Sequence, residues 1–142
     1  MTNAAIDIRP YRDSDEADVV ALWTEAFADS RPWNQPVVYI RRKLAVQPDL
    51  FLVGARDGRV IATVLAGYDG VRGWIYHLAV VPAYRRHGCG SAMMAAAEAR
   101  LRGLGCAKIN LQVVASNAEV VRFYERIGYA IEDRISMGRR LD

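Results

Sequence analysis

The stretch "VVPAYRRHGCGSAMM", residues 80–94, joins the end of a hydrophobic strand to a basic loop with two glycines and the start of a helix. Gly88 and Gly90 lack a Cβ, so the chain can bend sharply there and a ligand can approach the backbone. The amides in the first turn of a helix have no intrahelical partner and attract anions. The stretch therefore predicts a strand–loop–helix unit suited to a phosphate group.

Two familiar phosphate loops do not match this stretch. A Walker-type loop needs Lys-Ser or Lys-Thr after Gly90, and the dinucleotide fingerprint needs a third glycine where Met93 stands. Taken alone, the loop is equally compatible with a tight strand-to-helix turn whose basic residues Arg85, Arg86 and His87 are simply solvated. The loop by itself leaves both interpretations open.

The composition is that of an ordinary globular protein. Of 142 residues, 52% are hydrophobic and 25% charged, which predicts a single domain over residues 1–142. No apolar run approaches the roughly 18 residues of a membrane helix, and the start lacks a signal-peptide pattern. We therefore expect a cytoplasmic protein without a membrane partner.

Charge and cysteine content narrow the class of ligand. Residues 1–70 carry 8 basic and 10 acidic side chains, whereas residues 71–142 carry 11 and 6. A basic second half suits a phosphorylated small molecule, and its scattered arginines argue against a nucleic-acid partner. Cys89 and Cys106 have no CxxC or His/Cys spacing, so neither a disulfide nor a metal site is expected.

Periodicity and turn residues predict a mixed α/β fold in the order β-α-α-β-β-β-α-β-α-β-β. The predicted strands are residues 5–11, 50–56, 59–68, 72–81 and 107–114, with a final pair within 129–141. The predicted helices are residues 13–26, 36–46, 91–105 and 116–128, the last one capped by Ser116.

Two motifs resemble the signatures of the GNAT acetyltransferases. "HLAVVPAYRRHGCGSAMM" resembles the acetyl-CoA signature of that family, with matches at Arg85, Gly88 and Gly90. "SNAEVVRFYERIGY", residues 116–129, resembles the second signature, and the predicted element order is also that of the family. "RPWNQP" and "GYDGVRG" are similar to the bacterial YpeA branch. The resemblance implies the GNAT-like acyl-CoA N-acyltransferase fold.

The resemblance also implies acetyl-CoA as cosubstrate, with its pyrophosphate on the loop amides and its pantetheine arm along the strand before the loop, where that strand splays from the next. Asn117 matches a family position that contacts the cofactor, although it can equally be a helix-start residue. The residues expected to bind acetyl-CoA are Leu78, Ala79, Val80, Arg85, Arg86, His87, Gly88, Cys89, Gly90, Ser91 and Asn117.

Tyr124 matches the catalytic tyrosine of the family. A phenol stays protonated at neutral pH, so Tyr124 can protonate the departing thiolate, although its helical face also allows a core position. Gln112 stands where one branch of the family has a glutamate base, and an amide cannot take that proton. His77 is the nearby imidazole and the candidate base, with a structural or surface histidine as the alternative.

The acceptor side is expected in "RPWNQP", where Arg31, Trp33 and Asn34 are candidate substrate contacts; the alternative is a packing anchor for the loop. These residues together predict an N-acetyltransferase in which a primary amine of a small molecule or protein attacks acetyl-CoA directly. A catalytically silent acyl-CoA-binding sensor or regulatory module is the alternative. The sequence leaves open the acceptor, the use of other acyl-CoAs and the oligomeric state.

Overall fold

The computed structural model describes residues 6–28 and 32–142, so the predicted contact Arg31 lies outside the described residues. The chain falls into two compact units, residues 1–112 and residues 113–142, and each is described by itself. In the first unit the strands are β1 (Asp7–Pro10), β2 (Phe51–Arg56), β3 (Arg59–Tyr68), β4 (Gly73–Val80) and β5 (Ile109–Leu111), and the helices are α1 (Glu16–Ala26), α2 (Pro36–Leu44) and α3 (Cys89–Gly103).

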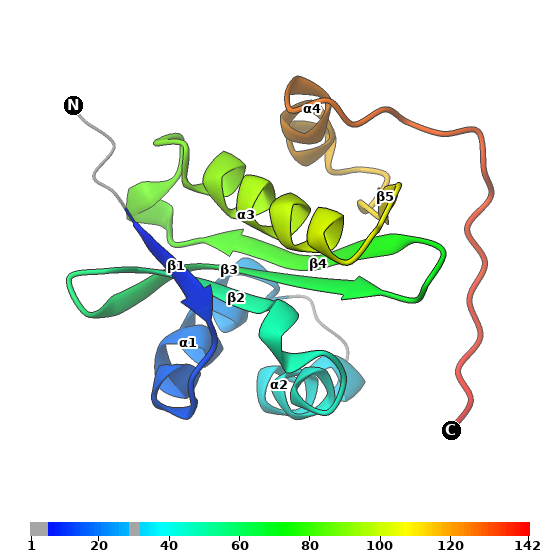
Figure 1. Cartoon of the computed structure of the whole chain (residues 1–142). Helices are drawn as coiled ribbons and strands as arrows, with labels where there is room; N and C mark the ends of the chain where they lie inside the picture. The colour runs from blue at the N-terminus through cyan, green and yellow to red at the C-terminus, as the bar shows by residue number, and fades with distance from the viewer. Residues whose placement is uncertain (1–5, 29–31) are drawn as a thin grey trace. The chain divides into compact units, whose positions relative to one another are not determined.

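The first unit is built on a five-stranded mixed sheet. Its strands lie in the order β1-β2-β3-β4-β5, antiparallel as far as β4, while β5 runs parallel to β4. Figure 1 shows α1 and α2 on one face of this sheet and α3 on the other. The mixed α/β fold class that the sequence predicts is confirmed.

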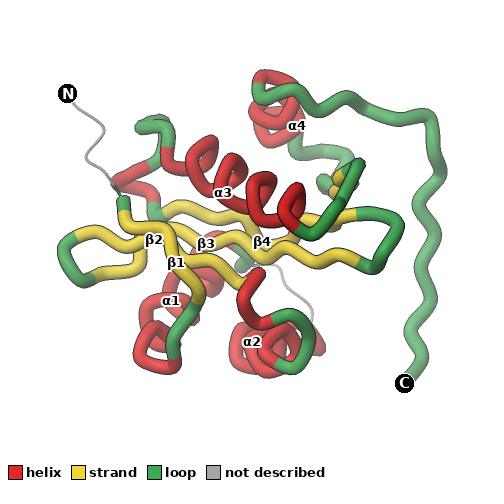
Figure 2. The backbone as a smooth tube through the Cα atoms, viewed as in Figure 1, coloured by secondary structure: helices red, strands yellow, loops and turns green. Residues whose placement is uncertain are grey.

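Strand β3 lies at the centre of the sheet and is covered on both faces. Seven consecutive residues, 60–66, are buried, as expected for a strand between two helical layers. On one side Trp23 of α1 stacks on Phe51, with ring centroids 5.7 Å apart. On the other side α3 buries Met93 and Met94. Figure 2 shows the strands in yellow between these red helices.

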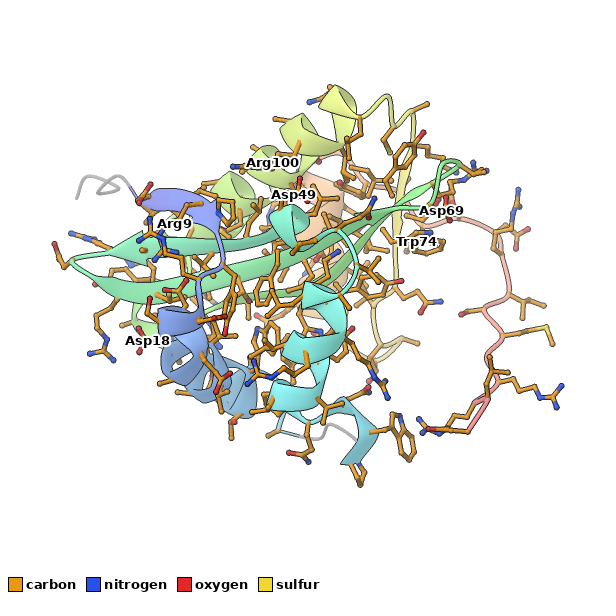
Figure 3. The ribbon with its side chains drawn as sticks, turned by 60° about the horizontal axis from the view of Figure 1, so that its bottom comes forward. Arg9, Asp18, Asp49, Asp69, Trp74 and Arg100 are labelled. Atoms are coloured by element: carbon orange, nitrogen blue, oxygen red, sulfur yellow. The ribbon has the colours of Figure 1, made fainter. Side chains whose placement is uncertain are left out.

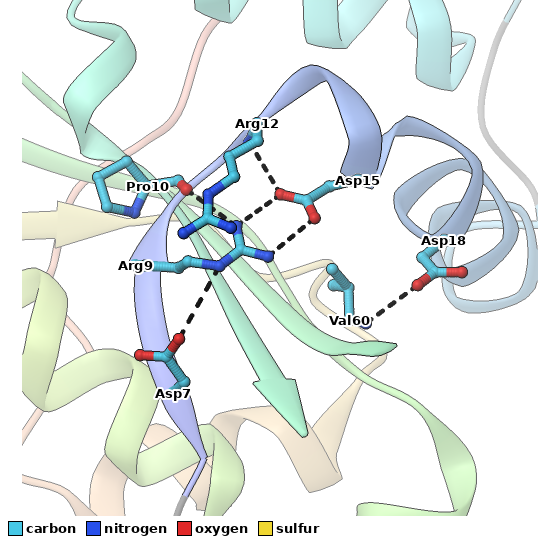
Figure 4. A network of polar contacts seen from close by, with 7 residues as sticks. All are labelled: Asp7, Arg9, Pro10, Arg12, Asp15, Asp18 and Val60. Atoms are coloured by element: carbon cyan, nitrogen blue, oxygen red, sulfur yellow. Dashed lines mark hydrogen bonds and ion pairs between the residues drawn. The ribbon is translucent and has the colours of Figure 1, made fainter. Parts of the chain in front are cut away.

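A network of charged side chains fixes the start of α1 on the sheet (Figure 4). Arg9 of β1 donates two hydrogen bonds to the Asp15 carboxylate, at 2.7 and 3.0 Å, and the backbone N–H of Arg12 donates a third at 2.8 Å. Burial alone would raise the pKa of Asp15, but these bonds lower it. Asp18 of α1 then accepts from the N–H of Val60 on β3 at 3.0 Å.

The turn between β3 and β4 is closed by the carboxylate of Asp69. It accepts hydrogen bonds from the N–H groups of Val71 and Arg72, at 2.8 and 2.7 Å. These bonds, that of Arg72 first, lower the pKa of Asp69. Figure 3 shows Asp69 close to Trp74, where β4 begins. The turn therefore delivers β4 into register against β3.

The second unit contains one helix, α4 (Ala118–Arg126). Asn117 is its N-cap, and its side-chain oxygen accepts from the N–H of Val120 at 3.4 Å. The expectation that Ser116 caps this helix is wrong by one residue. The helix ends before Gly128, whose φ of +102° suits a glycine after a helix.

The predicted final pair of strands within residues 129–141 does not form. Alternating Ile131, Ile135 and Met137 favoured strands there, yet their exposed fractions are 77%, 90% and 90%. Alternation stabilises a strand only when a neighbouring strand pairs with it and its apolar face is buried. Residues 130–142 are all exposed, so that condition is not met in this structure.

Candidate active site

Strand β4 contains a β-bulge at His77. Ala79 pairs with Thr63 and Tyr76 pairs with Leu65, so the three steps from Tyr76 to Ala79 are matched by only two on β3. His77 takes a φ of +50°, in the left-handed region that a side chain other than glycine rarely adopts. A bulge of this kind redirects the backbone and side chains around it.

Beyond the bulge, one edge of β4 is open. Strand β5 pairs only with residues 73–75 of β4, and no other described strand pairs with that edge. The N–H of Val81 donates to the carbonyl of Ile61 at 2.8 Å. Because hydrogen-bonding direction alternates along an antiparallel ladder, Leu78 and Val80 direct their N–H groups away from β3. Two backbone amides therefore point to the open edge.

The strand that follows α3 is shorter than the sequence predicted. Residues 107–114 were expected to form a strand, and only Ile109–Leu111 do so. β4 and β5 thus share only three paired positions before the pairing ends. The pairing thus ends before Leu78 to Val80, the residues where the resemblance led us to expect the two strands to separate.

The imidazole of His77 lies in an aromatic cage on the side of the sheet covered by α1 and α2. Its ring centroid is 4.0 Å from Tyr39, 4.3 Å from Phe27 and 4.7 Å from Trp23. Burial lowers the pKa of His77 from its usual 6.5 to about 4. His77 is therefore neutral at neutral pH and binds a proton only weakly.

A buried hydrogen-bond relay ends on the backbone of the same residue. The indole Nε1–H of Trp23 donates to Oγ1 of Thr63 at 2.8 Å, and that hydroxyl donates to the carbonyl of His77 at 3.0 Å. Thr63 is completely buried and Trp23 is 1% exposed. Sequence reasoning missed Thr63, because a threonine within a run of apolar strand residues carries no signal of a special role.

The loop after β4 leads directly into the N-terminus of α3. Gly88 is the N-cap with a φ of +83°, and no described side chain caps the first turn. The first amides of α3, at Cys89, Gly90 and Ser91, therefore lie where an anion can accept from them. The structure brings together these loop residues and the open edge of β4 in the first unit.

The side chain of Arg85 is engaged within the protein. Its Nε donates to the carbonyl of Val80 at 2.8 Å, and Nη2 forms an ion pair with Glu25 of α1 at 2.7 Å. These contacts hold the loop against the end of β4. Arg86 and His87 continue the loop, and Arg86 takes a φ of +65°.

Cys89 is a poor candidate for a nucleophile. Its side chain is 8% exposed, and burial raises the pKa of its thiol. A raised pKa leaves less of the reactive thiolate at neutral pH. It is the backbone amide of Cys89, and not its thiol, that can contribute to the site, as a hydrogen-bond donor to an anion.

Tyr124 belongs to the second unit, where it is buried with an exposed fraction of 9%. Its ring makes edge contacts with Phe123 and Tyr129, at centroid distances of 5.1 and 5.7 Å. Burial raises the pKa of Tyr124 from 10 to about 12. Its phenol is thus protonated throughout the physiological range and is a hydrogen-bond donor.

Three other predicted site residues, Trp33, Asn34 and Asn117, have a defined local setting. Trp33 lies in a single 3-10 turn with Asn34 and has an exposed fraction of 39%. Asn117 acts as the N-cap of α4, which accounts for its side chain without a ligand. Among residues 6–28 and 32–142, no group of His, Cys, Asp and Glu side chains is arranged to hold a metal ion.

Comparisons with known proteins agree on one family. The model of the acetyltransferase (GNAT) family matches residues 16–129. A protein of Sodalis glossinidius named an acetyltransferase is 42% identical over 137 residues, 96% of either chain. The crystal structure of Ard1 from Thermoplasma volcanium has a TM-score of 0.78 and 25% identity, covering 91% of this chain and 85% of that one.

A second solved structure extends the fold comparison. AAC(6')-Iy, in complex with a bisubstrate analogue of CoA and acetylneamine, has a TM-score of 0.79 at 16% identity, covering 96% of this chain and 99% of that chain. At this identity the likeness concerns the fold alone. In the described part of the present chain, no helix has the length and apolar character needed to cross a membrane.

Proposed function

Because the chain belongs to the GNAT family of acetyl-CoA-dependent N-acetyltransferases, we propose that it transfers the acetyl group to a primary amine by direct attack, with both substrates bound together. The observation that carries this proposal is the open edge of β4, which the basic loop of residues 81–88 connects to the uncapped N-terminus of α3. An elongated molecule with a polar arm at one end and phosphates at the other fits this arrangement, with its arm on the amides of β4 and its phosphates on those of α3.

We assign the binding of acetyl-CoA mainly to backbone groups. The amides of Leu78 and Val80 on the open edge suit the amide-containing pantetheine arm and the thioester carbonyl. The amides of residues 86–91 suit the pyrophosphate, since the helix terminus adds a favourable dipole. In this assignment Arg85 positions the loop through its bonds to Val80 and Glu25 and does not itself hold phosphate.

The chemical step requires stabilisation of an oxyanion and of a leaving thiolate. The amine nitrogen attacks the thioester carbon, the carbonyl oxygen gains negative charge, and collapse of this intermediate breaks the carbon–sulfur bond. We assign the amide of Leu78 to the oxyanion. We assign Tyr124 to the sulfur, because a phenol carries its proton at neutral pH; it gives this proton to the departing thiolate and regains one from solvent.

The proton of the amine needs another acceptor. A histidine with a pKa of about 4 is a weak base near neutral pH. We propose that the amine enters in its neutral form. Solvent then takes the proton that the nitrogen loses after its attack on the thioester. The prediction that His77 is the base is tested by measuring kcat against pH in wild type and in His77→Gln. If His77 is the base, the variant loses the fall in kcat at acidic pH that its protonation causes.

The acceptor class proposed is a primary amine whose binding involves the segment with Trp33 and Asn34. We further propose that residues 1–142 act as one domain, since the family model spans parts of both units. Both described cysteines are free thiols, which is consistent with the cytoplasmic location that we propose.

The function is tested by following release of free CoA from acetyl-CoA with a panel of amines and peptides. The variant Tyr124→Phe should lower kcat by roughly 100-fold or more while acetyl-CoA binding is retained, because it removes only the donor. Tyr68→Phe serves as the matched control; Tyr68 donates only to the carbonyl of Gly70 in an exposed turn. Wild-type turnover by Tyr124→Phe would overturn the assignment of the acid.

A further inference from the structure

We infer that Thr63 is a positioning residue for the acetyl transfer, because its hydroxyl fixes the His77–Leu78 peptide so that the Leu78 amide faces the thioester carbonyl. Thr63 lies on the neighbouring strand β3, so it acts only through this peptide. The inference rests on the proposed function, in which the Leu78 amide stabilises the oxyanion.

The geometry of the peptide bond carries the first step. In a trans peptide the C=O of one residue and the N–H of the next point in opposite directions. The C=O of His77 is held toward β3 by Oγ1 of Thr63 at 3.0 Å. The N–H of Leu78 therefore points away from β3, to the edge that β5 leaves open beyond residue 75.

The bulge explains why this peptide needs a dedicated partner. At a bulge the regular ladder is interrupted and the extra residue is left without its ladder partner. His77 also has a φ of +50°, an unfavourable conformation that persists only where the surroundings impose it. Without the hydroxyl of Thr63 the carbonyl of His77 would lose this hydrogen-bond donor, and the peptide could rotate.

The hydrogen bond from Trp23 determines that the hydroxyl of Thr63 acts as the donor to His77. The hydroxyl of Thr63 accepts from Nε1–H of Trp23 at 2.8 Å, and the indole can only donate. The single proton of the hydroxyl is therefore available for the carbonyl of His77. Both side chains are fully or almost fully buried, so water does not compete for the bond between Trp23 and Thr63.

The ring of His77 gives the same residue a second anchor. Tyr39 and Phe27 pack against the imidazole at 4.0 and 4.3 Å, and Trp23 contacts its edge at 4.7 Å. Trp23 thus supports both the ring of His77 and, through Thr63, its carbonyl. The bulge is held at two points by residues of α1, α2 and β3.

The test compares Thr63→Val with Thr63→Ser in amine-dependent CoA release. Valine keeps the shape but removes both hydrogen bonds, so kcat should fall about 10- to 100-fold, as when an oxyanion donor is misplaced. The Kd for CoA, which lacks the acetyl carbonyl, should change less than about threefold. Serine keeps the hydroxyl and should restore most of kcat. Thr24→Val is the matched control, since Thr24 lies on the exposed side of α1 and bonds only the carbonyl of Val20.

Three outcomes separate the inference from the proposed function. Wild-type protein that releases no CoA with any amine contradicts the proposed function. An active wild type together with full kcat in Thr63→Val overturns the inference alone. If Thr63→Val does not fold, Trp23→Phe gives the second test: it removes the donor to Thr63, so kcat should fall about 3- to 10-fold with CoA affinity kept, and an unchanged kcat overturns the inference.

Discussion

At the scale of single residues, His77 shows how backbone and side chain contribute separately to one site. Its backbone forms the bulge that turns the next amide to the open edge. Its ring is surrounded by three aromatic rings and is kept neutral by burial. The same residue therefore shapes the site by its conformation, while its low pKa makes proton uptake at neutral pH unfavourable.

This burial predicts a specific pH dependence of stability. The pKa of His77 is about 4 in the folded chain and 6.5 when unfolded, so between these values the unfolded chain binds more protons. The free energy of unfolding should fall as pH drops from 6.5 to 4, by up to about 1.4 kcal/mol per pH unit from this group. Urea unfolding of wild type and His77→Gln over this range measures the contribution.

The difference in slope between the two proteins is the readout, because other acidic groups titrate equally in both. His77→Gln should lose the part of the slope that lies above pH 4. An identical slope in the two proteins would mean that the histidine is accessible to protons in the folded chain.

Residue-level prediction from sequence succeeded where chemistry is local. Gly88 was expected to allow a bend, and it adopts a positive φ at the N-cap of α3. The orientation of His77 could not be predicted, since strict strand alternation breaks at a bulge. Thr63 could not be identified either, because its role depends on Trp23, 40 positions earlier in the chain.

At the scale of elements, the N-terminus of α3 is the feature to which we assign the pyrophosphate of acetyl-CoA. Gly88→Ala forces a side chain into a left-handed conformation at a cost of about 1 kcal/mol. If the loop amides hold the pyrophosphate, this variant should also weaken acetyl-CoA binding by roughly 10-fold. Calorimetric titration with acetyl-CoA measures the loss.

The opposite end of the same helix supplies the control. Gly105 has a φ of +87°, and an added Cβ would meet nothing within 4 Å. Gly105→Ala should therefore cost similar stability but leave acetyl-CoA affinity unchanged. Equal loss of affinity in both variants would show that general destabilisation, and not the loop, weakens binding.

Elements set by local sequence signals were predicted correctly, whereas those that depend on distant residues were not. The β2–β3 hairpin was predicted from Asp57 and Gly58, which both adopt the positive φ values of a tight hairpin turn. Helices α2 and α3 were predicted from proline and glycine signals close to their ends. The length of β5 and the absence of strands after α4 depend on pairing with distant residues, which periodicity alone does not report.

At the scale of the whole molecule, family membership and charge distribution support the same account. The match to the family model and the 42% identity over 96% of either chain agree with the two sequence motifs. The basic excess lies in residues 71–142, which include the loop proposed for the pyrophosphate. These features bear on the acetyl donor, whereas for the amine we propose a binding role of the segment with Trp33 and Asn34.

We propose that acetyl-CoA lies along the open edge of β4 and on the first amides of α3, and amide hydrogen exchange with and without CoA tests this placement. We expect the amides of Leu78 and Val80 and of residues 88–91 to exchange rapidly in the free protein and to be protected by CoA. The amide of Ala79, which faces β3, should be protected in both states. Protection by CoA at other sites, with the exchange of the Leu78 and Val80 amides unchanged, would contradict this placement of the cofactor.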